Sequence, residues 1–476
     1  MFKIYASVIA ILISGAVQAQ DSLWTLQRTI KYAVDNNLDI KQSVLNERLA
    51  RLQLLQSQLS QLPNASVSGD IGRSYGRSID PTTNQFINQG YTFSGLNGNV
   101  DVLLFGWFQK RNTISQNKFL SKAAIADVDQ LKDNISLNVA TAFLRILMAK
   151  EQIKVQENQL KFSLKQEEQT EYFVKAGRSP ELDLAQMQAQ VATDSSNYFT
   201  AVASYQQSLL DMKAIMNFEI SAPYTAIAPD VNNIPLAELG TLDPEQVYLQ
   251  AHDHFGSIRS SQLRIDAAQK SLAVSRGALY PQLSLAGQFG TNYSSTLKEV
   301  TGAQFIQYTP NGQIVDVNGT AYPVSEPSYF LATRTTPFGD QFSNNFRQTV
   351  ALSLTVPLFS GWTSRTNVNR AKVDVQSKEL TMQSTKLKLK QDVYKAYYDA
   401  KVAIQKYYAA ARAEEASGRA YAYAQKRYEL GLMNALELLT TQNNSLKATS
   451  DALSAKYDML FKLKVIDYYL GKEIKL

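Results

Sequence analysis

The chain of 476 residues has no cysteine, only two histidines and no run of 18 apolar residues beyond its N-terminus. Without cysteine it has no disulfide, no thiolate metal site and no thiol for a lipid at a processed N-terminus. The lack of a long apolar run excludes a transmembrane α-helix, so any membrane crossing must use strands. The net charge of +6 is modest, and bases alternate with acids without forming the basic stripe of a nucleic-acid surface.

Proline is absent from two long stretches, 107–176 and 362–430, which together hold a single glycine. Each stretch is predicted to be one continuous helix, roughly 100 Å long at about 1.5 Å per residue. Apolar residues within the first recur in steps of four and three, as in Ile135, Val139 and Ala142. That spacing is typical of a coiled-coil seam. Rods of this length do not suit a compact enzyme.

The chain repeats itself with two different offsets. Ala33 matches Ala251 at an offset of 218, whereas Gly177 matches Gly431 at an offset of 254. The second repeat therefore carries 36 extra residues between its strands. We expect a first repeat at 20–217, a proline-containing connector at 218–256, a second repeat at 257–470 and a C-terminal tail at 471–476. Residues 295–348, rich in Gly, Pro, Thr, Asn and aromatics, are predicted to be a long surface loop.

Both repeats show the same order of predicted elements. A helix, 38–62 or 257–279, ends at a proline. Strands of alternating polarity follow, most clearly around Val350, Leu352 and Leu354, with the length of a tilted transmembrane strand. After each long helix a glycine suits a helix C-terminus, and a return helix runs to about residue 217 or 470.

The start of each return helix carries a capping signal. Ser179 before Pro180 predicts an N-cap followed by proline at the first helical position. Asn434, with Glu437 three residues later, resembles a capping box. Two antiparallel helical hairpins are therefore expected.

The N-terminus resembles a secretory signal. Lys3 precedes an apolar run at 4–13, and Val17-Gln18-Ala19 has the small-x-small form of a cleavage site. The run is too short for a membrane-spanning helix. Residues 1–19 are therefore predicted to be a signal peptide.

Four predicted strands cannot close a membrane barrel alone, because open edges leave backbone groups unsatisfied in lipid. Two copies would give eight strands with a filled interior, whereas three copies would give twelve and an open lumen. A trimer is the better count for a transport protein.

The order and spacing of these features resemble the TolC family of outer-membrane efflux proteins over about residues 24–470. The resemblance is carried by the exported repeat, the prolines before the strands, the stretch 356–361 (Val-Pro-Leu-Phe-Ser-Gly) and the stretch 428–437. It implies an α+β membrane protein: a homotrimer with a twelve-stranded β-barrel and a periplasmic α-barrel of long coiled α-helical hairpins. The connector and the C-terminal tail would form an equatorial belt.

The resemblance also implies function. The trimer would be a passive exit duct in a tripartite efflux system, with a periplasmic adaptor (membrane fusion) protein and an inner-membrane pump of the RND or ABC type. It would sit in outer-membrane lipid and extend into the periplasm. The architecture also serves type I protein secretion, so the cargo stays open. A non-conducting coiled-coil envelope protein is the alternative, which the alternating strands disfavour.

In the family the glycine turns lie at the periplasmic tip, where the tunnel closes and adaptors dock. The resemblance places the gate at Asp183, Tyr428 and Glu437, with Arg178 as a further partner. The adaptor-docking tip would comprise Gly177, Gly431, Leu432 and Met433. Met433 stands where relatives carry an arginine, and Thr440 where a second acid can follow.

Simpler interpretations apply to the same residues. Asp183 and Glu437 lie in the first turn of a helix, where the helix dipole favours an acid in any protein. Tyr428 equally suits the packing of a helix end. The cluster His252-Asp253-His254 suggests a metal, but no third ligand is evident, and a surface patch at a helix start fits better. No catalytic constellation or cofactor motif is found, so no enzyme is expected.

Overall fold

The computed structural model describes residues 23–79, 84–88, 90–227, 243–472 and 474. The predicted signal peptide and much of the connector, 228–242, lie outside these residues. The chain divides into two compact units. We call Met1–Gln53, Gln116–Ala268 and Val373–Leu476 the helical unit, and Leu54–Ser115 and Gln269–Lys372 the sheet unit.

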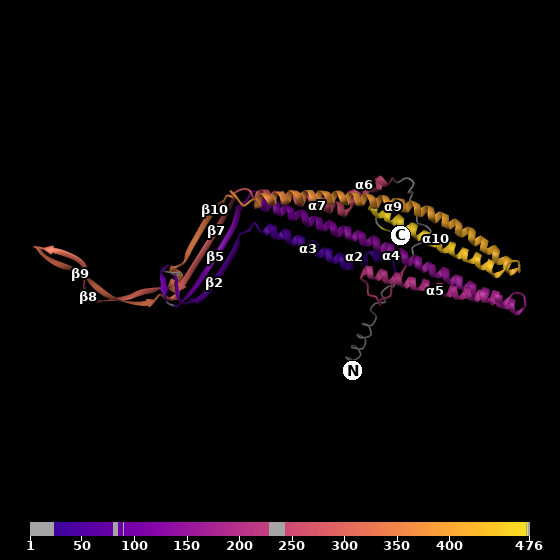
Figure 1. Cartoon of the computed structure of the whole chain (residues 1–476), viewed down its shortest axis with the longest axis horizontal. Coiled ribbons are helices and arrows are strands. Elements are labelled where there is room, and N and C mark those ends of the chain that lie inside the picture. Colours follow the sequence, from indigo (N-terminus) through magenta and orange to yellow (C-terminus); the bar gives the residue numbers. More distant parts are fainter. Residues whose placement is uncertain (1–22, 80–83, 89, 228–242, 473, 475–476) are drawn as a thin grey trace, which may run out of the picture. The chain divides into compact units, whose positions relative to one another are not determined.

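Long helices dominate the chain (Figure 1). Each predicted rod is a single helix of 67 residues, α4 (Gln109–Lys175) and α9 (Thr363–Glu429). The return helices are α5 (Glu181–Met216) and α10 (Ala435–Tyr469). The two antiparallel helical hairpins are confirmed. Within the described part of the chain, no helix combines the length and the apolar character that a membrane crossing demands.

Shorter helices precede the strands of each repeat. They are α2 (Leu26–Asn36), α3 (Leu38–Leu59), α6 (Pro244–His254) and α7 (Gly256–Gly277). β1 (Leu23–Trp24) pairs in parallel with β6 (Thr225–Ala226).

Helix α6 corrects the expected boundary of the second repeat. Its bounds match those of α2 at the offset of 218, so the repeat begins at Pro244, within the expected connector. Pro244 occupies the first turn, and the side chain of Asp243 caps it by accepting a hydrogen bond from the Glu245 amide. A proline at this position starts a helix rather than preventing one.

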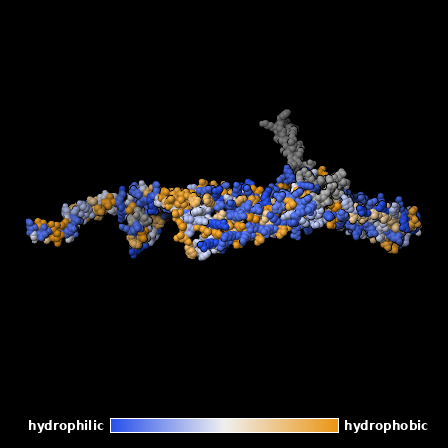
Figure 2. Space-filling model, turned by 90° about the horizontal axis from the view of Figure 1, so that it is seen from above, coloured by the Kyte–Doolittle hydropathy of each residue, from blue (hydrophilic) through white to orange (hydrophobic). Residues whose placement is uncertain are grey.

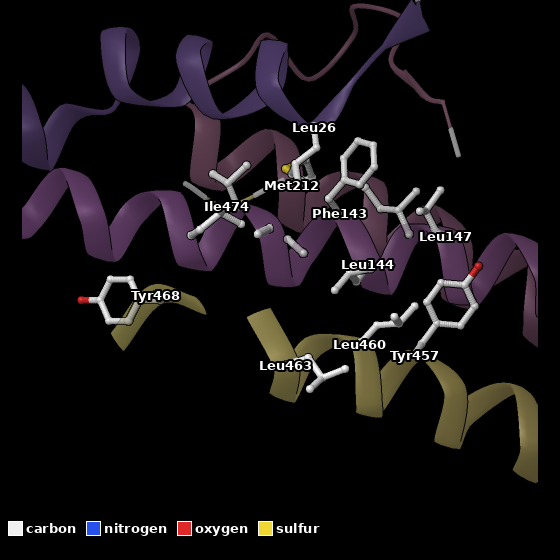
Figure 3. Packing of buried hydrophobic residues seen from close by; sticks show 14 of the residues in the cluster. Leu26, Phe143, Leu144, Leu147, Met212, Tyr457, Leu460, Leu463, Tyr468 and Ile474 are labelled. Carbon is white, nitrogen blue, oxygen red and sulfur yellow. The ribbon is translucent and has the colours of Figure 1, made fainter. Parts of the chain in front are cut away.

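The helical unit is built on an apolar core at the middle of the hairpins. Phe143, Ile146 and Leu147 of α4 are buried against Met212 of α5 and Leu460 of α10 (Figure 3). Ile146 lies in the predicted seam together with the buried Ile135, Val139 and Ala142, and Phe143 and Leu147 lie beside it. Full burial of each large apolar side chain contributes about 1.5–3 kcal/mol, so this core is a main source of stability.

The sheet unit contains four antiparallel strands in the order β10-β7-β5-β2 (Figure 1). They are β2 (Asn64–Ser74), β5 (Tyr91–Phe105), β7 (Gln282–Ser294) and β10 (Arg347–Thr355). The predicted count of four strands is therefore confirmed for this sheet. β2 and β10 lie at its two ends, and among the described residues no strand pairs with the outer edge of either.

The sheet has one apolar face and one polar face. Cross-strand partners place Val350, Gly287, Val100 and Ala65 in one row. The adjacent row, on the opposite face, holds Thr349, Gln288, Asn99 and Ser66. Because successive side chains of a strand point to opposite faces, the alternation seen in single strands extends across the whole sheet.

Residues 295–348 do not form the expected surface loop. β8 (Lys298–Val317) and β9 (Thr320–Thr335) make a long antiparallel ribbon, and α8 (Phe338–Asn344) follows. Three irregularities in the pairing of β8 interrupt its alternation of polarity, which is why the sequence did not predict a strand. A shorter pair, β3 (Arg77–Ile79) and β4 (Phe86–Asn88), lies between β2 and β5.

Candidate functional site: the hairpin tips

Both glycine turns at the hairpin tips have the same backbone geometry. Gly177 and Gly431 have φ values of +68° and +74°. At each turn the amide after the glycine bonds back to a carbonyl five residues earlier, from Arg178 to Phe173 and from Leu432 to Arg427, both at 2.8 Å. This is the Schellman arrangement, and glycine is favoured there because a side chain would strain the left-handed conformation.

The α10 hairpin starts with the predicted cap. The Glu437 amide donates to Asn434 Oδ1 at 2.8 Å, and Asn434 Nδ2 donates to the Glu437 carboxylate at 3.3 Å. Glu437 is exposed in the first turn of α10. Its charge therefore stabilises the helix start and is also accessible to solvent and ions.

The α5 hairpin starts differently from the prediction. Pro180 is the N-cap and makes no side-chain cap hydrogen bond. Ser179, the predicted cap, instead donates from Oγ to Asp183 Oδ2 at 2.6 Å. Asp183 is half-buried, so the two equivalent acids of the repeat differ in environment.

Tyr428 is buried between the two hairpins. Its hydroxyl lies 3.0 Å from Thr170 Oγ1 of α4. The Thr170 hydroxyl donates its proton to the Gln166 carbonyl, so the Tyr428 hydroxyl is the donor in its bond to Thr170. Burial raises the pKa of Tyr428, and the charge of Asp183 acts in the same direction. The two residues are thus electrostatic neighbours, but the phenol is bonded to Thr170.

Arg178 lies at the exposed surface of the tip. Its guanidinium stands 5.2 Å from the centroid of the Phe173 ring, a cation–π distance. Among the described residues, no ion pair joins it to Asp183 or Glu437. One chain therefore brings Tyr428 near Asp183, and leaves Arg178 and Glu437 available to other partners.

The tips also carry exposed apolar side chains. Leu432, predicted to belong to the docking tip, is 64% exposed, whereas Met433 packs partly against the cluster around Tyr428. The other exposed apolar residues of the tips are Tyr172, Leu182, Leu430 and Leu436. An apolar tip of this kind is suited to protein contact.

Below the tips, the structure contains a buried polar layer that was not predicted. We call it the polar seam, and it consists of Gln156, Ser163, Gln166, Thr170, Asp194 and Gln442. Its centre is the fully buried Asp194 of α5. Gln159 and Gln190 donate to its two carboxylate oxygens at 3.1 and 2.9 Å.

A second hairpin contributes to the same network. Ser163 also donates to the Asp194 carboxylate, and Gln442 of α10 donates to Ser163 Oγ at 3.3 Å. The Tyr421 hydroxyl and the Gln442 Oε1 atom are buried and have no hydrogen-bond partner among the described residues. Burial, and then the charge of Asp194, raise the pKa of Tyr421. The seam is therefore only partly satisfied.

A heptad pattern in the sequence would have located this layer. Met187, Asp194 and Ala201 of α5 are seven residues apart and all buried. A charged residue in the middle of such a row must lie in the seam.

The histidine cluster has no partner set for a metal. His252 and His254 lie in the last turn of α6 rather than at a helix start. Among the described residues, no group of three metal-ligating side chains is found.

Known proteins provide an independent comparison. A family model described as outer membrane efflux protein matches residues 29–217 and 247–472. The chain is also 18% identical over 435 residues to toxin and drug export protein A of Aggregatibacter actinomycetemcomitans, covering 91% of this chain and 83% of the relative.

Solved structures share the fold. The CmeC outer membrane channel of Campylobacter jejuni superposes with a TM-score of 0.74 at 19% identity, over 94% of this chain and 85% of that one. The open state of the MtrE outer membrane channel of Neisseria gonorrhoeae gives a TM-score of 0.69 at 20% identity, over 94% and 89%. The TolC-like fold that the family resemblance implied is confirmed.

Proposed function

Because the chain belongs to the outer membrane efflux protein family, we propose that three copies form a passive duct across the periplasm and outer membrane. The observation that carries this proposal is the two-faced sheet with two open edges. An apolar face suits lipid and a polar face suits a water-filled lumen. Pairing β10 of one copy with β2 of the next would close the sheet without leaving edges in lipid.

The helical unit supports the same assembly through its unpartnered apolar stripes. On α9, Val373, Leu380 and Leu387 recur every seven residues and are 62, 64 and 70% exposed. On α3, Leu38 and Leu45 begin a similar exposed row. Seams with this spacing pack against other helices, and neighbouring copies of the chain would supply them.

The surface where the strands meet the long helices fits a membrane interface. Leu358, Phe359 and Trp362 are 92, 81 and 61% exposed there. Figure 2 shows concentrated apolar colour on this face of the molecule. Aromatic and aliphatic residues of this kind form the girdles of outer-membrane barrels.

We propose the tips as the gate and the docking surface. Glu437 would form a ring of three carboxylates in a trimer, and Asp183, Tyr428 and Arg178 would contribute to closure. The exposed apolar residues at Gly177 and Gly431, including Leu432 and Met433, would bind a periplasmic adaptor that connects an inner-membrane pump. Small molecules are the proposed cargo, as the relative described as a toxin and drug export protein suggests.

A planar-bilayer recording of the detergent-purified protein tests the duct. We expect a trimeric mass by light scattering and discrete single-channel conductance. Glu437→Gln should weaken block by multivalent cations, since it removes the proposed ring of charge. The matched control is Glu181→Gln, which removes an acid from the first turn of the other hairpin. A monomeric protein, or a trimer without conductance, contradicts the proposal.

A further inference from the structure

The ribbon of β8 and β9 is an element that the duct itself does not require. It contains the residues inserted into the second repeat, and nearly all of its side chains are exposed. An isolated two-stranded ribbon is marginally stable in water. A ribbon of 20 and 16 residues therefore needs something to pack against.

One face of the ribbon is mainly apolar between Val300 and Ile314, with Lys298 at its base and Asp316 towards its tip. Phe305 pairs with Tyr329, and Tyr308 pairs with Pro327. Phe305 makes edge-on ring contacts with Tyr308 and Tyr329, at centroid distances of 5.2 and 6.0 Å. We call this the apolar ribbon face, with Val300, Phe305, Tyr308, Ile314, Tyr329 and Leu331, each 48–69% exposed.

Irregularities in β8 keep these residues on one face. The pairing shifts between Val300 and Gly302 and again between Phe305 and Gln307, so that one residue of β8 is unpaired each time. Each such bulge changes which face the following residues occupy. Without the bulges, Phe305 and Tyr308 would point to opposite sides.

The opposite face is mainly polar. Glu299 and Arg334 form an ion pair there. Gln304, Gln307 and Thr309 continue along it. Phe330 also lies on this side, and towards the tip of the ribbon this side becomes apolar, with Val315, Val317 and Tyr322. Over the half of the ribbon nearer its base, the difference between the faces indicates that one is covered and the other is in contact with water.

The base of the ribbon is held rigidly. Gln341 of α8 is fully buried, and its Oε1 accepts from the Ser294 amide at 2.9 Å. Its Nε2 donates to the carbonyls of Ser294 and Thr336 at 2.9 and 2.8 Å. Asn345 adds a bond to the Asn292 carbonyl at 2.8 Å. The two ends of the ribbon are thus fixed to each other and to β7.

Proline makes the edges of the ribbon poor templates for another strand. Pro310, Pro323 and Pro327 cannot donate a backbone hydrogen bond. Edge pairing is blocked at these positions. A partner would therefore contact the face of the ribbon rather than extend its ladder.

We propose that the apolar ribbon face is covered by the ribbons of neighbouring copies of this chain, packed around the axis of the trimer. The inference rests on the proposed function. The ribbon joins β7 to β10, and β10 is the open edge that would meet the next copy. Closing the sheet brings each ribbon beside a neighbour that carries the same apolar side chains between Val300 and Ile314. Figure 2 shows the exposed apolar side chains on the ribbon.

Cysteine cross-linking tests this directly because the natural chain has no cysteine. Tyr308→Cys places a thiol on the apolar ribbon face, and Thr309→Cys places one on the opposite face. Phe305→Cys and Gln304→Cys repeat the comparison two pairs away. We expect a short bismaleimide to link pairs of copies through Tyr308→Cys and Phe305→Cys, so that a covalent dimer band appears and the monomer band weakens in denaturing gels. The two controls, Thr309→Cys and Gln304→Cys, should give only the monomer band in the same denaturing gels.

Light scattering on the same samples separates this inference from the proposed function. A trimer in which both faces cross-link equally, or neither does, overturns the ribbon packing and leaves the duct intact. Cross-linking of Tyr308→Cys to a different polypeptide in whole cells also overturns it. A monomeric protein overturns both proposals.

Discussion

The middle of the helical hairpins and the part below their tips follow one heptad seam but fill it with different chemistry. Around Phe143 the seam is apolar and fully packed. Around Asp194 it is polar, and several buried groups have no hydrogen-bond partner in the part of the chain that the structure describes. Apolar packing gains stability without needing exact partners, whereas a partly satisfied polar network is costly and specific. We therefore expect the seam to be more stable at its centre than towards the tips.

The largest expected effect comes from the apolar half. Phe143→Ala should destabilise the protein by about 3–5 kcal/mol, because it leaves a cavity among large side chains. Urea unfolding of the purified protein followed by helical circular dichroism measures this. A loss of unfolding free energy below about 1 kcal/mol would mean that the centre is not the more stable half of the seam.

The polar half should respond less strongly and locally. Asp194→Ala leaves Ser163, Gln159 and Gln190 without their acceptor and should cost about 2–3 kcal/mol. Hydrogen exchange should accelerate in the tips and not around Phe143. Asp194→Asn, which retains an acceptor of the same size, is the matched control. Uniform acceleration along both hairpins would contradict a separate behaviour of the two halves.

Alkaline pH should loosen the apolar half through Tyr224. Burial raises the pKa of Tyr224 to about 12 from 10.0. The unfolded phenol ionises above pH 10 while the folded one stays neutral, so stability is lost as pH rises from about 10 to about 12. Tyr224→Phe should flatten this part of the stability profile. An unchanged profile in the variant would assign the alkaline loss to other groups.

Substitution of the turn glycines should be destabilising because of their backbone conformation alone. A Cβ at Gly431 would meet no atom within 4 Å, so Gly431→Ala should cost about 1–2 kcal/mol through its left-handed conformation. Gly418 lies inside α9 and also has free space. Gly418→Ala should therefore stabilise by about 0.5–1 kcal/mol. Equal effects of the two changes would exclude the conformational explanation.

The smallest effect distinguishes the two tyrosines of the tip region. Tyr421→Phe removes a buried hydroxyl without a partner and should leave stability unchanged or slightly higher. Tyr428→Phe removes the donor to Thr170 and should cost about 1 kcal/mol. Parallel thermal melts of the two variants provide the comparison. A larger loss for Tyr421→Phe would reveal a partner for its hydroxyl.

Features with a local rule were predictable from the sequence. The proline-free stretches gave α4 and α9 to within about two residues, and Gly177 and Gly431 marked the turns. Alternation predicted the sheet because each strand keeps one apolar face. Because the chain is duplicated, the signals that predicted one helical hairpin also predicted the other.

Features that depend on contacts between distant residues were not predictable. The ribbon was missed because the bulges in β8 shift its alternation, and its pairing joins residues across a long insertion. Asp194 was missed because a single acid in a helix is usually solvated, and only the neighbouring helices show that it is buried. The family resemblance suggested Asp183 as the partner of Tyr428, whereas the bond from Tyr428 to Thr170 was not predicted.

The equal length of α4 and α9 restricts how this protein can change during evolution. An inserted residue in one helix would raise its tip by about 1.5 Å and rotate the remainder by about 100°. The contacts between Thr170 and Tyr428, which join the two hairpins, would then be lost. Length can change only if both helices gain or lose residues together, in steps that preserve the heptad. The matched lengths of α4 and α9 therefore set the distance that the proposed duct can span.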